Sequence, residues 1–474
     1  MKSLLFVIPW KASLVNEDHF VFAEAPERAP ENVVNLASYL IKQGAAIEIA
    51  DMTRFLVETK GSVDGALDLL RRQCERFNPD VIGLSFFTAR FEFAARIVEF
   101  LYSIYPHERP LIIAGGVHPT LLPKVTYQYI NFDALIIGEG EIPLTNLLKG
   151  ESLDSISGVF LPGQDKPSAA PILSNLDELP FSDWDLVDHH FYTQPSYQIS
   201  NTRLDSVMPI TFGRSCMYRC HFCAHNSFLK PRCHTPEYFL EMMRHTEKQC
   251  GVNTFIIQDS SIGSYKREWI KVCKLLVDAG SPYRWWANLR ANQVDEDFLR
   301  LIKEAGCIKL FFGFESGSQR ILDRMNKRET VEQLEQAAEL CHKVGIPFYT
   351  SYIVNYFGEE DSDLEATERL ILKTRPTSLS INTFSPIPGS VDYDTHADII
   401  EPLLKTIHDW SMLGMLFSPL LFGNMTEERY KYWYKRLKDL KYAINSTEPA
   451  ITGTNVKITE LAPCRRHEDG ALWI

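Results

Sequence analysis

The 474-residue sequence lacks both an excess of basic residues and long apolar runs. Its 49 Lys and Arg residues are outnumbered by 61 Asp and Glu residues, which gives a formal net charge of −12. A broad basic face is therefore missing, and we expect no nucleic acid partner. The apolar run from Met415 to Phe422 is broken by Pro419 and is far shorter than the roughly 20 residues of a membrane-spanning helix. We expect no membrane association.

We also expect no export signal, because the apolar start of the chain ends at Pro9 and Trp10. We therefore expect a cytoplasmic protein with reduced thiols. Cys464 lies in a polar tail for which we find no role. The cysteines in apolar or terminal positions of helix-like and strand-like patterns are predicted to be small buried side chains: Cys74, Cys250, Cys273, Cys307 and Cys341.

One cysteine cluster is present, and it consists of Cys216, Cys220 and Cys223 directly after the apolar run 208–212. This spacing lets a loop place three sulfurs around one metal centre, and soft thiolates suit an iron–sulfur cluster or zinc. Three thiolates leave a tetrahedral zinc or a four-iron cluster one ligand short. The fourth position stays open for a substrate or takes a nearby side chain: His221, His225, Cys233 or His234.

Residues 1–150 alternate strand-like and helix-like patterns, which predicts an α/β domain with a doubly wound parallel sheet. Ligands bind such sheets at the carboxyl ends of the strands. Paired glycines at these ends let a planar ligand or a phosphate approach the backbone, or they only form tight turns. The small and polar residues at these ends are Ser85, Thr88, Gly115, Gly116, His118, Gly138 and Glu139.

The rest of the chain divides into three predicted parts. Residues 151–205 are rich in Pro, Ser, Asp and Gly and read as a linker. Residues 206–392 contain a second alternation with enough strands for a partial barrel of the (β/α)6 kind. Residues 393–474 form a helical segment rich in aromatic side chains, which are more often core than binding site.

Cys216, Cys220 and Cys223, with Phe222 before the last, resemble the CxxxCxΦC signature of the radical S-adenosylmethionine (SAM) superfamily. The run from Phe312 to Gln319 is also similar to that superfamily's "fGxESGsq" run, and 385–390 resembles its "P.PGT" turn. The resemblance implies a [4Fe-4S] cluster on the three thiolates. Its open iron would bind the amino and carboxylate groups of SAM, and electron transfer would cleave SAM to a 5′-deoxyadenosyl radical.

Three further residues fall at strand ends of the predicted barrel, where its chemistry belongs. By the same resemblance, Glu315 would contact the SAM ribose, Arg290 its carboxylate and Asp259 its amino-acid end, beside Phe222 of the cysteine loop. An acid, a guanidinium and another acid complement these groups of SAM. The alternative is an ion-pair network across the barrel mouth.

The first half of the chain resembles the cobalamin-binding domain that precedes the catalytic domain in one large radical SAM class. The shared features are a strand-end serine (Ser85), a Gly-Gly-x-His turn (115–118) and a Gly-Glu-Gly-Glu turn (138–141). The usual Asp-x-His-x-x-Gly motif is replaced by 9–14, so the histidine that ligates cobalt from below is missing. Cobalamin would then be held without a protein ligand, or the domain would be empty, and His118 is a poor substitute ligand.

These resemblances predict a cobalamin-dependent C-methyltransferase that acts on an unactivated carbon of a small metabolite or a peptide-derived product. An external electron donor such as flavodoxin or ferredoxin would reduce the cluster. The same two-domain plan also hosts ring formation or contraction, dehydration and cleavage without methyl transfer. A remote alternative is a zinc-stabilised sensor of a corrinoid or nucleotide.

Overall fold

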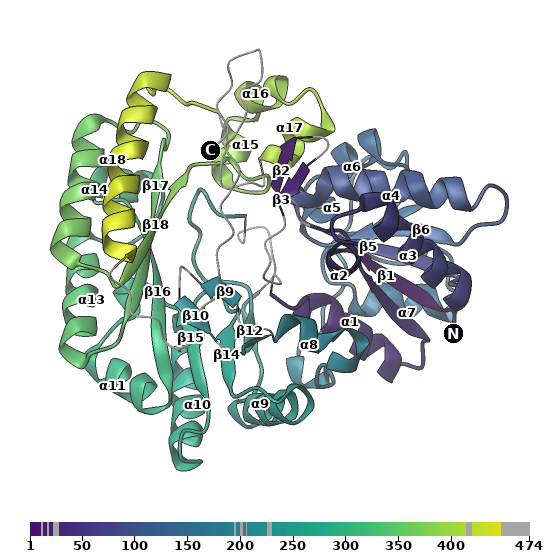
Figure 1. Cartoon of the computed structure of the whole chain (residues 1–474), viewed down its shortest axis with the longest axis horizontal. Helices are drawn as coiled ribbons and strands as arrows, with labels where there is room; N and C mark the ends of the chain where they lie inside the picture. Colours follow the sequence, from purple (N-terminus) through teal and green to yellow (C-terminus); the bar gives the residue numbers. More distant parts are fainter. Residues whose placement is uncertain are drawn as a thin grey trace.

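Two six-stranded sheets organise the chain and lie on opposite sides of the molecule (Figure 1). The computed structural model describes residues 1–10, 13–16, 19–21, 28–193, 196–199, 202–204, 206–224, 230–413 and 420–446. No helix in this part of the chain is both long and apolar enough to cross a membrane.

The first sheet has the strand order β4-β1-β5-β6-β7-β8, and all neighbours are parallel except β7 and β8. Strand β1 reads Leu-Leu-Phe-Val-Ile and is buried throughout, as expected for a strand covered on both faces. Strand β8 comes from the range that we predicted to be a linker. The strands are β1 (Leu4–Ile8), β4 (Ile47–Asp51), β5 (Val81–Ser85), β6 (Leu111–Gly115), β7 (Ala134–Ile136) and β8 (Val159–Phe160).

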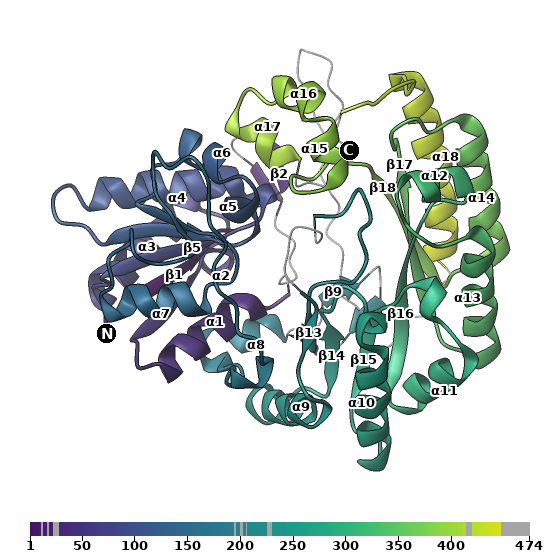
Figure 2. The ribbon, with the colours of Figure 1, turned by 180° about the vertical axis from the view of Figure 1, so that it is seen from behind.

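Helices follow the strands of this sheet in alternation and cover both of its faces, which confirms the doubly wound prediction (Figures 1 and 2). Two buried clusters divide the helices between the faces, one with α1 and α7 and one with α3 and α4. The helices are α1 (Glu31–Lys42), α2 (Met52–Glu58), α3 (Val63–Phe77), η1 (Thr88–Arg90), α4 (Phe91–Ile104), α5 (Val117–Leu121), α6 (Pro123–Tyr129) and α7 (Glu141–Lys149).

Short elements connect the two sheets. Trp184 is 1% exposed, and its Nε1 donates to Thr246 Oγ1 at 3.3 Å, so the predicted linker packs on the next domain. The elements are η2 (Leu176–Glu178), η3 (Trp184–Leu186), α8 (His189–Tyr192) and two ribbons, β2 (Ser13–Asn16) with β3 (His19–Val21) and β9 (Ser196–Ile199) with β10 (Thr202–Leu204).

The second sheet is all parallel, and its strands neighbour each other in chain order, which confirms the predicted six-stranded partial barrel. Its strands are β11 (Met208–Ile210), β14 (Thr254–Ile257), β15 (Arg284–Asn288), β16 (Cys307–Glu315), β17 (Phe348–Val354) and β18 (Ser378–Thr383). Its helices are α9 (Pro236–Cys250), η5 (Ile262–Tyr265), α10 (Lys266–Asp278), η6 (Ala291–Gln293), α11 (Glu296–Glu304), α12 (Gln319–Arg324), α13 (Val331–Val344) and α14 (Asp361–Thr374).

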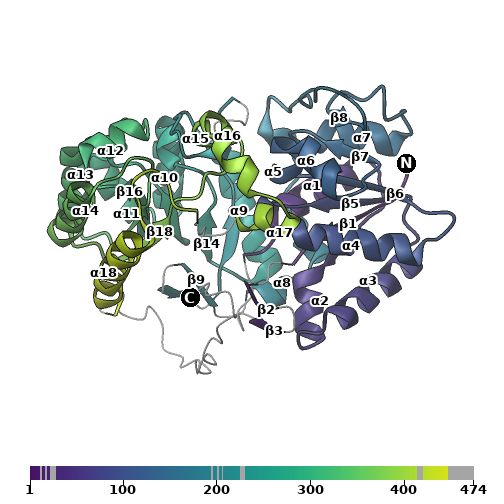
Figure 3. The ribbon, with the colours of Figure 1, turned by 90° about the horizontal axis from the view of Figure 1, so that it is seen from above.

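The described part of the C-terminal segment is helical and returns to the first domain. Helix α17 lies beside α4 (Figure 3), and the Glu92 N–H donates to Ser411 Oγ at 3.0 Å. The long α18 instead packs on the outer side of β18 (Figures 1 and 2). The aromatic Phe417 and the tail with Cys464 lie outside the described residues. The elements are α15 (Val391–Thr395), α16 (Ala397–Ile400), η7 (Glu401–Leu403), α17 (Ile407–Met412) and α18 (Glu427–Asn445).

The apolar core is continuous across the boundary between the two domains. One cluster contains Leu4 of β1 together with Met208 of β11, and another joins Leu5 of β1 to Phe384, which follows β18. Burial of shared apolar surface is the dominant favourable term in packing, so the two sheets are held together by their cores. The cysteines that we predicted to be buried are all buried in the structure: Cys74, Cys250, Cys273, Cys307 and Cys341.

Candidate active site

The cysteine loop leaves the carboxyl end of β11 through the short strand β12 (Gly213–Arg214), which pairs with β13 (Arg232–Cys233). The turn into the loop places Ser215 in the left-handed region, with φ of 77°. The loop is then fixed by its backbone, because the His221 N–H donates to Met325 O at 2.9 Å and the Cys223 N–H donates to Cys220 O at 3.2 Å. The three thiols therefore lie on a constrained loop at the mouth of the barrel.

The three predicted metal-binding cysteines differ in exposure. Cys220 is 7% exposed, whereas Cys216 and Cys223 are half-buried. Phe222 packs its ring against the core cluster that contains Met325. Among the described residues, no three His, Cys, Asp or Glu side chains come close enough together to hold a single metal ion.

The described candidates for a fourth protein ligand make contacts of their own. His234 Nδ1 lies 2.9 Å from Asp177 Oδ1, and His221 Nδ1 lies 3.1 Å from Arg324 O. Burial raises the pKa of the Cys233 thiol to about 12. His225 lies outside the described residues. Three thiols on one loop suit a four-iron cluster that keeps one metal corner open.

Arg290 follows β15 and reaches the cysteine loop. Its Nη1 donates to Cys220 Sγ at 3.4 Å, and its guanidinium lies 3.8 Å from the ring centroid of Tyr218. Its Nη2 donates to Lys327 O and forms an ion pair with Glu329 at 3.0 Å. Burial lowers the pKa of Arg290, but the charges of Glu329 and Cys220 outweigh that effect and the pKa is raised.

Glu315 ends β16 and lies further along the same chain of charges. Its carboxylate is 3.5 Å from Lys327 Nζ and accepts from Ser351 Oγ at 3.3 Å. Lys327 is also 3.4 Å from Glu329. Burial raises the pKa of Glu315 despite the nearby Lys327. A Cβ on Gly313 would lie 2.1 Å from Glu315 Oε1, so only glycine leaves room for this carboxylate.

Asp259 follows β14 and holds the start of the cysteine loop. Its Oδ1 accepts from the Phe212 N–H at 2.8 Å and from the Gly213 N–H at 3.0 Å. Burial raises the pKa of Asp259 to about 7. Asp259, Arg290 and Glu315 are therefore brought to one mouth, where all three take part in contacts within the protein. Their predicted roles toward SAM stay predictions.

The predicted cobalamin-binding residues lie at the carboxyl edge of the first sheet, as expected. Gly116 has φ of 92°, and a Cβ there would lie 3.0 Å from both Ser85 Oγ and Phe86 N. Gly138 has φ of 97°, and its N–H donates to Thr120 Oγ1 at 3.0 Å. These glycines are required by the turns, and Gly115 precedes the first of them at the end of β6.

His118 is fully buried behind this edge. Its Nδ1 lies 3.2 Å from Thr88 Oγ1, and its ring centroid lies 4.0 Å from that of Phe91. Trp10, which lies in the run 9–14 that replaces the lower-ligand motif, is also fully buried, 5.1 Å from Phe93 between ring centroids. Residues 11 and 12 lie outside the described residues.

Glu139 turns away from the first sheet and toward the cysteine loop. It pairs with Arg214 at 3.1 Å and with Arg232, while Glu141 pairs with Arg214 at 2.8 Å. Arg214 lies two positions before Cys216 in the sequence. These four side chains, which we call the domain clasp, join the predicted corrinoid edge to the predicted cluster loop.

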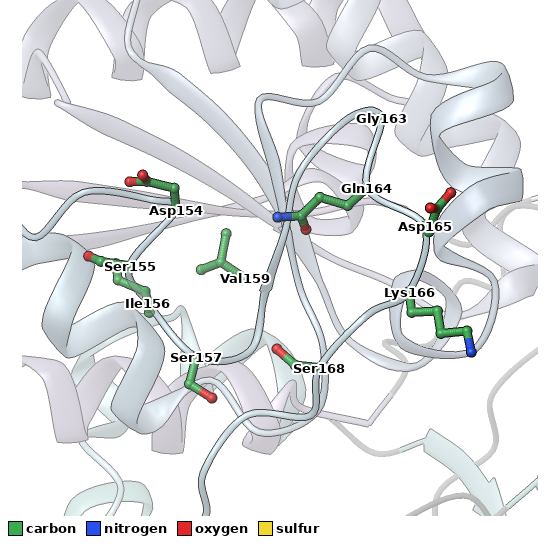
Figure 4. A pocket seen from close by; sticks show the side chains of 10 residues that line it. All are labelled: Asp154, Ser155, Ile156, Ser157, Val159, Gly163, Gln164, Asp165, Lys166 and Ser168. Atoms are coloured by element: carbon green, nitrogen blue, oxygen red, sulfur yellow. The ribbon is translucent and has the colours of Figure 1, made fainter.

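A cavity of about 600 Å³ lies at the outer edge of the first sheet, around 154–168 (Figure 4). Its side chains are mainly small and polar, and they include Asp154, Gln164 and Lys166. None of the predicted site residues lines it, so we do not place the chemistry there.

Sequence reasoning missed Lys327, Glu329 and the two arginines of the domain clasp. Lys327 stands in the run that continues the superfamily resemblance, which was the available signal for it. Glu329, Arg214 and Arg232 belong to no recognised motif, because their ion-pair partners lie far away in the sequence.

Family models match two separate parts of the chain. The model described as "Radical SAM superfamily" matches residues 210–371, and the one described as "B12 binding domain" matches residues 31–148. A radical SAM domain uses a [4Fe-4S] cluster and SAM, and the second match adds cobalamin.

Relatives and solved structures resemble the chain over most of its length. The chain is 26% identical over 326 residues to an uncharacterized methyltransferase of Pyrococcus horikoshii. The aligned region covers 67% of this chain and 69% of that protein. It is 26% identical over 389 residues to an anaerobic magnesium-protoporphyrin IX monomethyl ester cyclase of Rubrivivax gelatinosus, covering 78% and 67%. The radical SAM methyltransferase TsrM of Kitasatospora setae superposes with a TM-score of 0.67 at 16% identity, over 84% of this chain and 77% of that chain. The chain is thus a member of the radical SAM superfamily and carries a B12-binding domain ahead of its radical SAM domain.

Proposed function

We propose that the protein is a cobalamin-dependent radical SAM C-methyltransferase that acts on an unactivated carbon of a small metabolite or a peptide-derived product. Cys216, Cys220 and Cys223 would hold the [4Fe-4S] cluster, and the edge formed by Ser85 and the 115–118 turn would face the corrinoid. The cluster would supply an electron for reductive cleavage of SAM, and cobalamin would supply the methyl group. A small donor such as flavodoxin or ferredoxin would reduce the cluster.

The domain clasp carries this proposal. Glu139 and Glu141 come from the strand-end turn of the B12-binding domain, and Arg214 stands directly before the cysteine loop. Two cofactors bound at these places would face each other across one substrate. Methyl transfer needs that proximity, because a fixed geometry replaces a bimolecular encounter.

The chain's own residues would prepare the site in three ways. Asp259 fixes the start of the loop through two backbone N–H groups. The buried charges from Glu315 to Arg290 line the mouth and offer polar groups to SAM. The buried Tyr356 and Phe357, after β17, pack against Phe384 and would help to exclude water from the site.

Cysteine variants test the metal assignment. Alanine at position 216, 220 or 223 should reduce iron and acid-labile sulfide from about four each per chain to a small fraction after anaerobic reconstitution. Cys233→Ala is the matched control, because this thiol lies beside the loop on β13 and should leave the iron content unchanged. Zinc at about one per chain without sulfide would instead support the sensor.

A second reaction class has support of its own. The lower-ligand motif is absent, Trp10 is buried in its place, and one relative is named as a cyclase. In this alternative, the protein would cleave SAM without methyl transfer. Product analysis separates the two: cobalamin-dependent formation of S-adenosylhomocysteine supports the methyltransferase, whereas 5′-deoxyadenosine alone, with or without cobalamin, supports the alternative.

A further inference from the structure

Arg290 contacts a sulfur that we propose as a cluster ligand. The Nη1 to Sγ distance is 3.4 Å, and Arg290 and Cys220 are only 8% and 7% exposed. The guanidinium cannot swing away easily, because Tyr218 lies against its face and the Lys327 carbonyl accepts from its Nη2. The donor is thus aimed at the sulfur in a site with little water.

The charge of Arg290 is balanced on its far side by Glu329. The two side chains form an ion pair at 3.0 Å, and the Glu329 side chain is fully buried. The Asn292 N–H donates to Glu329 Oε1 at 3.2 Å, which fixes the carboxylate. Lys327 lies 3.4 Å from the same carboxylate, on the side toward Glu315. The field at Cys220 therefore depends on both Arg290 and Glu329.

We infer that Arg290 is a positioning residue that raises the reduction potential of the cluster through its hydrogen bond to Cys220 Sγ, and that Glu329 limits this effect. The inference rests on the proposed function, because it takes Cys220 as a ligand. Hydrogen bonds to cluster sulfurs are among the factors that set such potentials.

The sign follows from the charge that reduction adds. An external reductant transfers one electron and converts the cluster from the 2+ to the 1+ state, with no bond made or broken. A cationic donor at the sulfur stabilises the more negative state more strongly. The neighbouring carboxylate opposes it, and both act over short distances in a buried site.

The experiment is a potentiometric titration of the reconstituted full-length protein, followed by electron paramagnetic resonance of the reduced cluster. Arg290→Met should make the cluster about tenfold harder to reduce, which corresponds to a 59 mV lower potential for a one-electron couple. Glu329→Gln should shift the potential in the opposite direction, because the arginine then acts without its counter-charge. The matched control is Lys309→Met, which removes a buried cation near the start of β16 and should leave the potential unchanged.

Opposite shifts in the two variants support the inference, since a merely structural role would change cluster content but not the potential in both directions. Unchanged potentials in variants that contain a full cluster would overturn it and leave the proposed function intact. If Arg290→Met does not retain iron, the reduction potential of the near-isosteric Glu329→Gln variant alone decides whether the inference holds. Wild-type protein that assembles no cluster would refute the proposed function as well.

Discussion

His118 shows how a single residue acquires a role from its surroundings. In the sequence it belongs to a turn at a ligand-binding edge, but in the structure its ring is fully buried against Phe91. Burial disfavours the charged imidazolium and lowers the pKa of His118 from 6.5 to about 3. A neutral, enclosed ring contributes packing, so we expect it to act in stability and not as a cobalt ligand.

The pKa of His118 predicts a dependence of stability on pH. The unfolded chain binds a proton at this histidine below pH 6.5, whereas the folded protein does not until about pH 3. The stabilisation of the folded protein by neutral His118 is therefore complete above pH 6.5. It decreases by about 1.4 kcal/mol for each pH unit between pH 6.5 and about pH 3. The free energy of unfolding should fall less steeply between pH 6.5 and 4 in His118→Asn than in the wild type.

The same variant checks the corrinoid assignment. His118→Asn should keep the wild-type absorption spectrum of bound hydroxocobalamin, because the ring is fully buried. Parallel pH profiles in the two proteins, or a changed corrinoid spectrum, would contradict the role in packing.

At the scale of elements, α18 protects the open edge of the barrel sheet. Its last residue, Asn445, accepts from the Leu379 N–H at 2.8 Å and donates to the Leu379 carbonyl at 3.1 Å. At Leu379 the side-chain amide thus takes the place of a neighbouring strand. An unpaired edge strand would invite association with another chain.

Removing this amide should destabilise the edge. Asn445→Ala leaves two buried backbone groups unsatisfied, so we expect the free energy of unfolding to fall by about 2 kcal/mol and aggregation on heating to increase. Asn382→Ala is the control, because Asn382 on the same strand donates to the Ser380 side chain only. Equal losses in denaturant titrations of the two variants would show that the backbone pairing is unimportant.

Sequence patterns predicted elements well where the determinants are local. The buried Leu4–Ile8 strand, the six strands of the barrel and the cysteine loop follow from apolar runs and spacing. The role of Asn445 does not, because Leu379 lies 66 residues away. Glu329 was missed for a similar reason, since only the folded loop brings it to Arg290. Charges distant in sequence gain partners from the tertiary fold alone.

At the scale of the molecule, the two domains share apolar core clusters and several polar contacts. The Glu31 carboxylate at the start of α1 accepts from the Thr211 N–H and hydroxyl after β11, each at 2.8 Å. The domain clasp adds ion pairs at a second place on the same interface. Such an interface would keep the two proposed cofactor sites at a constant distance and orientation.

Arg214→Met tests whether the domain clasp couples the domains. The change leaves Glu141, whose side chain is 5% exposed, without its cation, and a broken buried pair costs about 3 kcal/mol. We expect a lower melting temperature and faster amide exchange at 138–141 and in the cysteine loop. Adding Glu141→Gln should recover part of the loss, because it removes the stranded charge. Arg72→Met, in an exposed pair on α3, should change little. Strictly additive losses in the double variant would mean that the Arg214–Glu141 pair does not couple the domains.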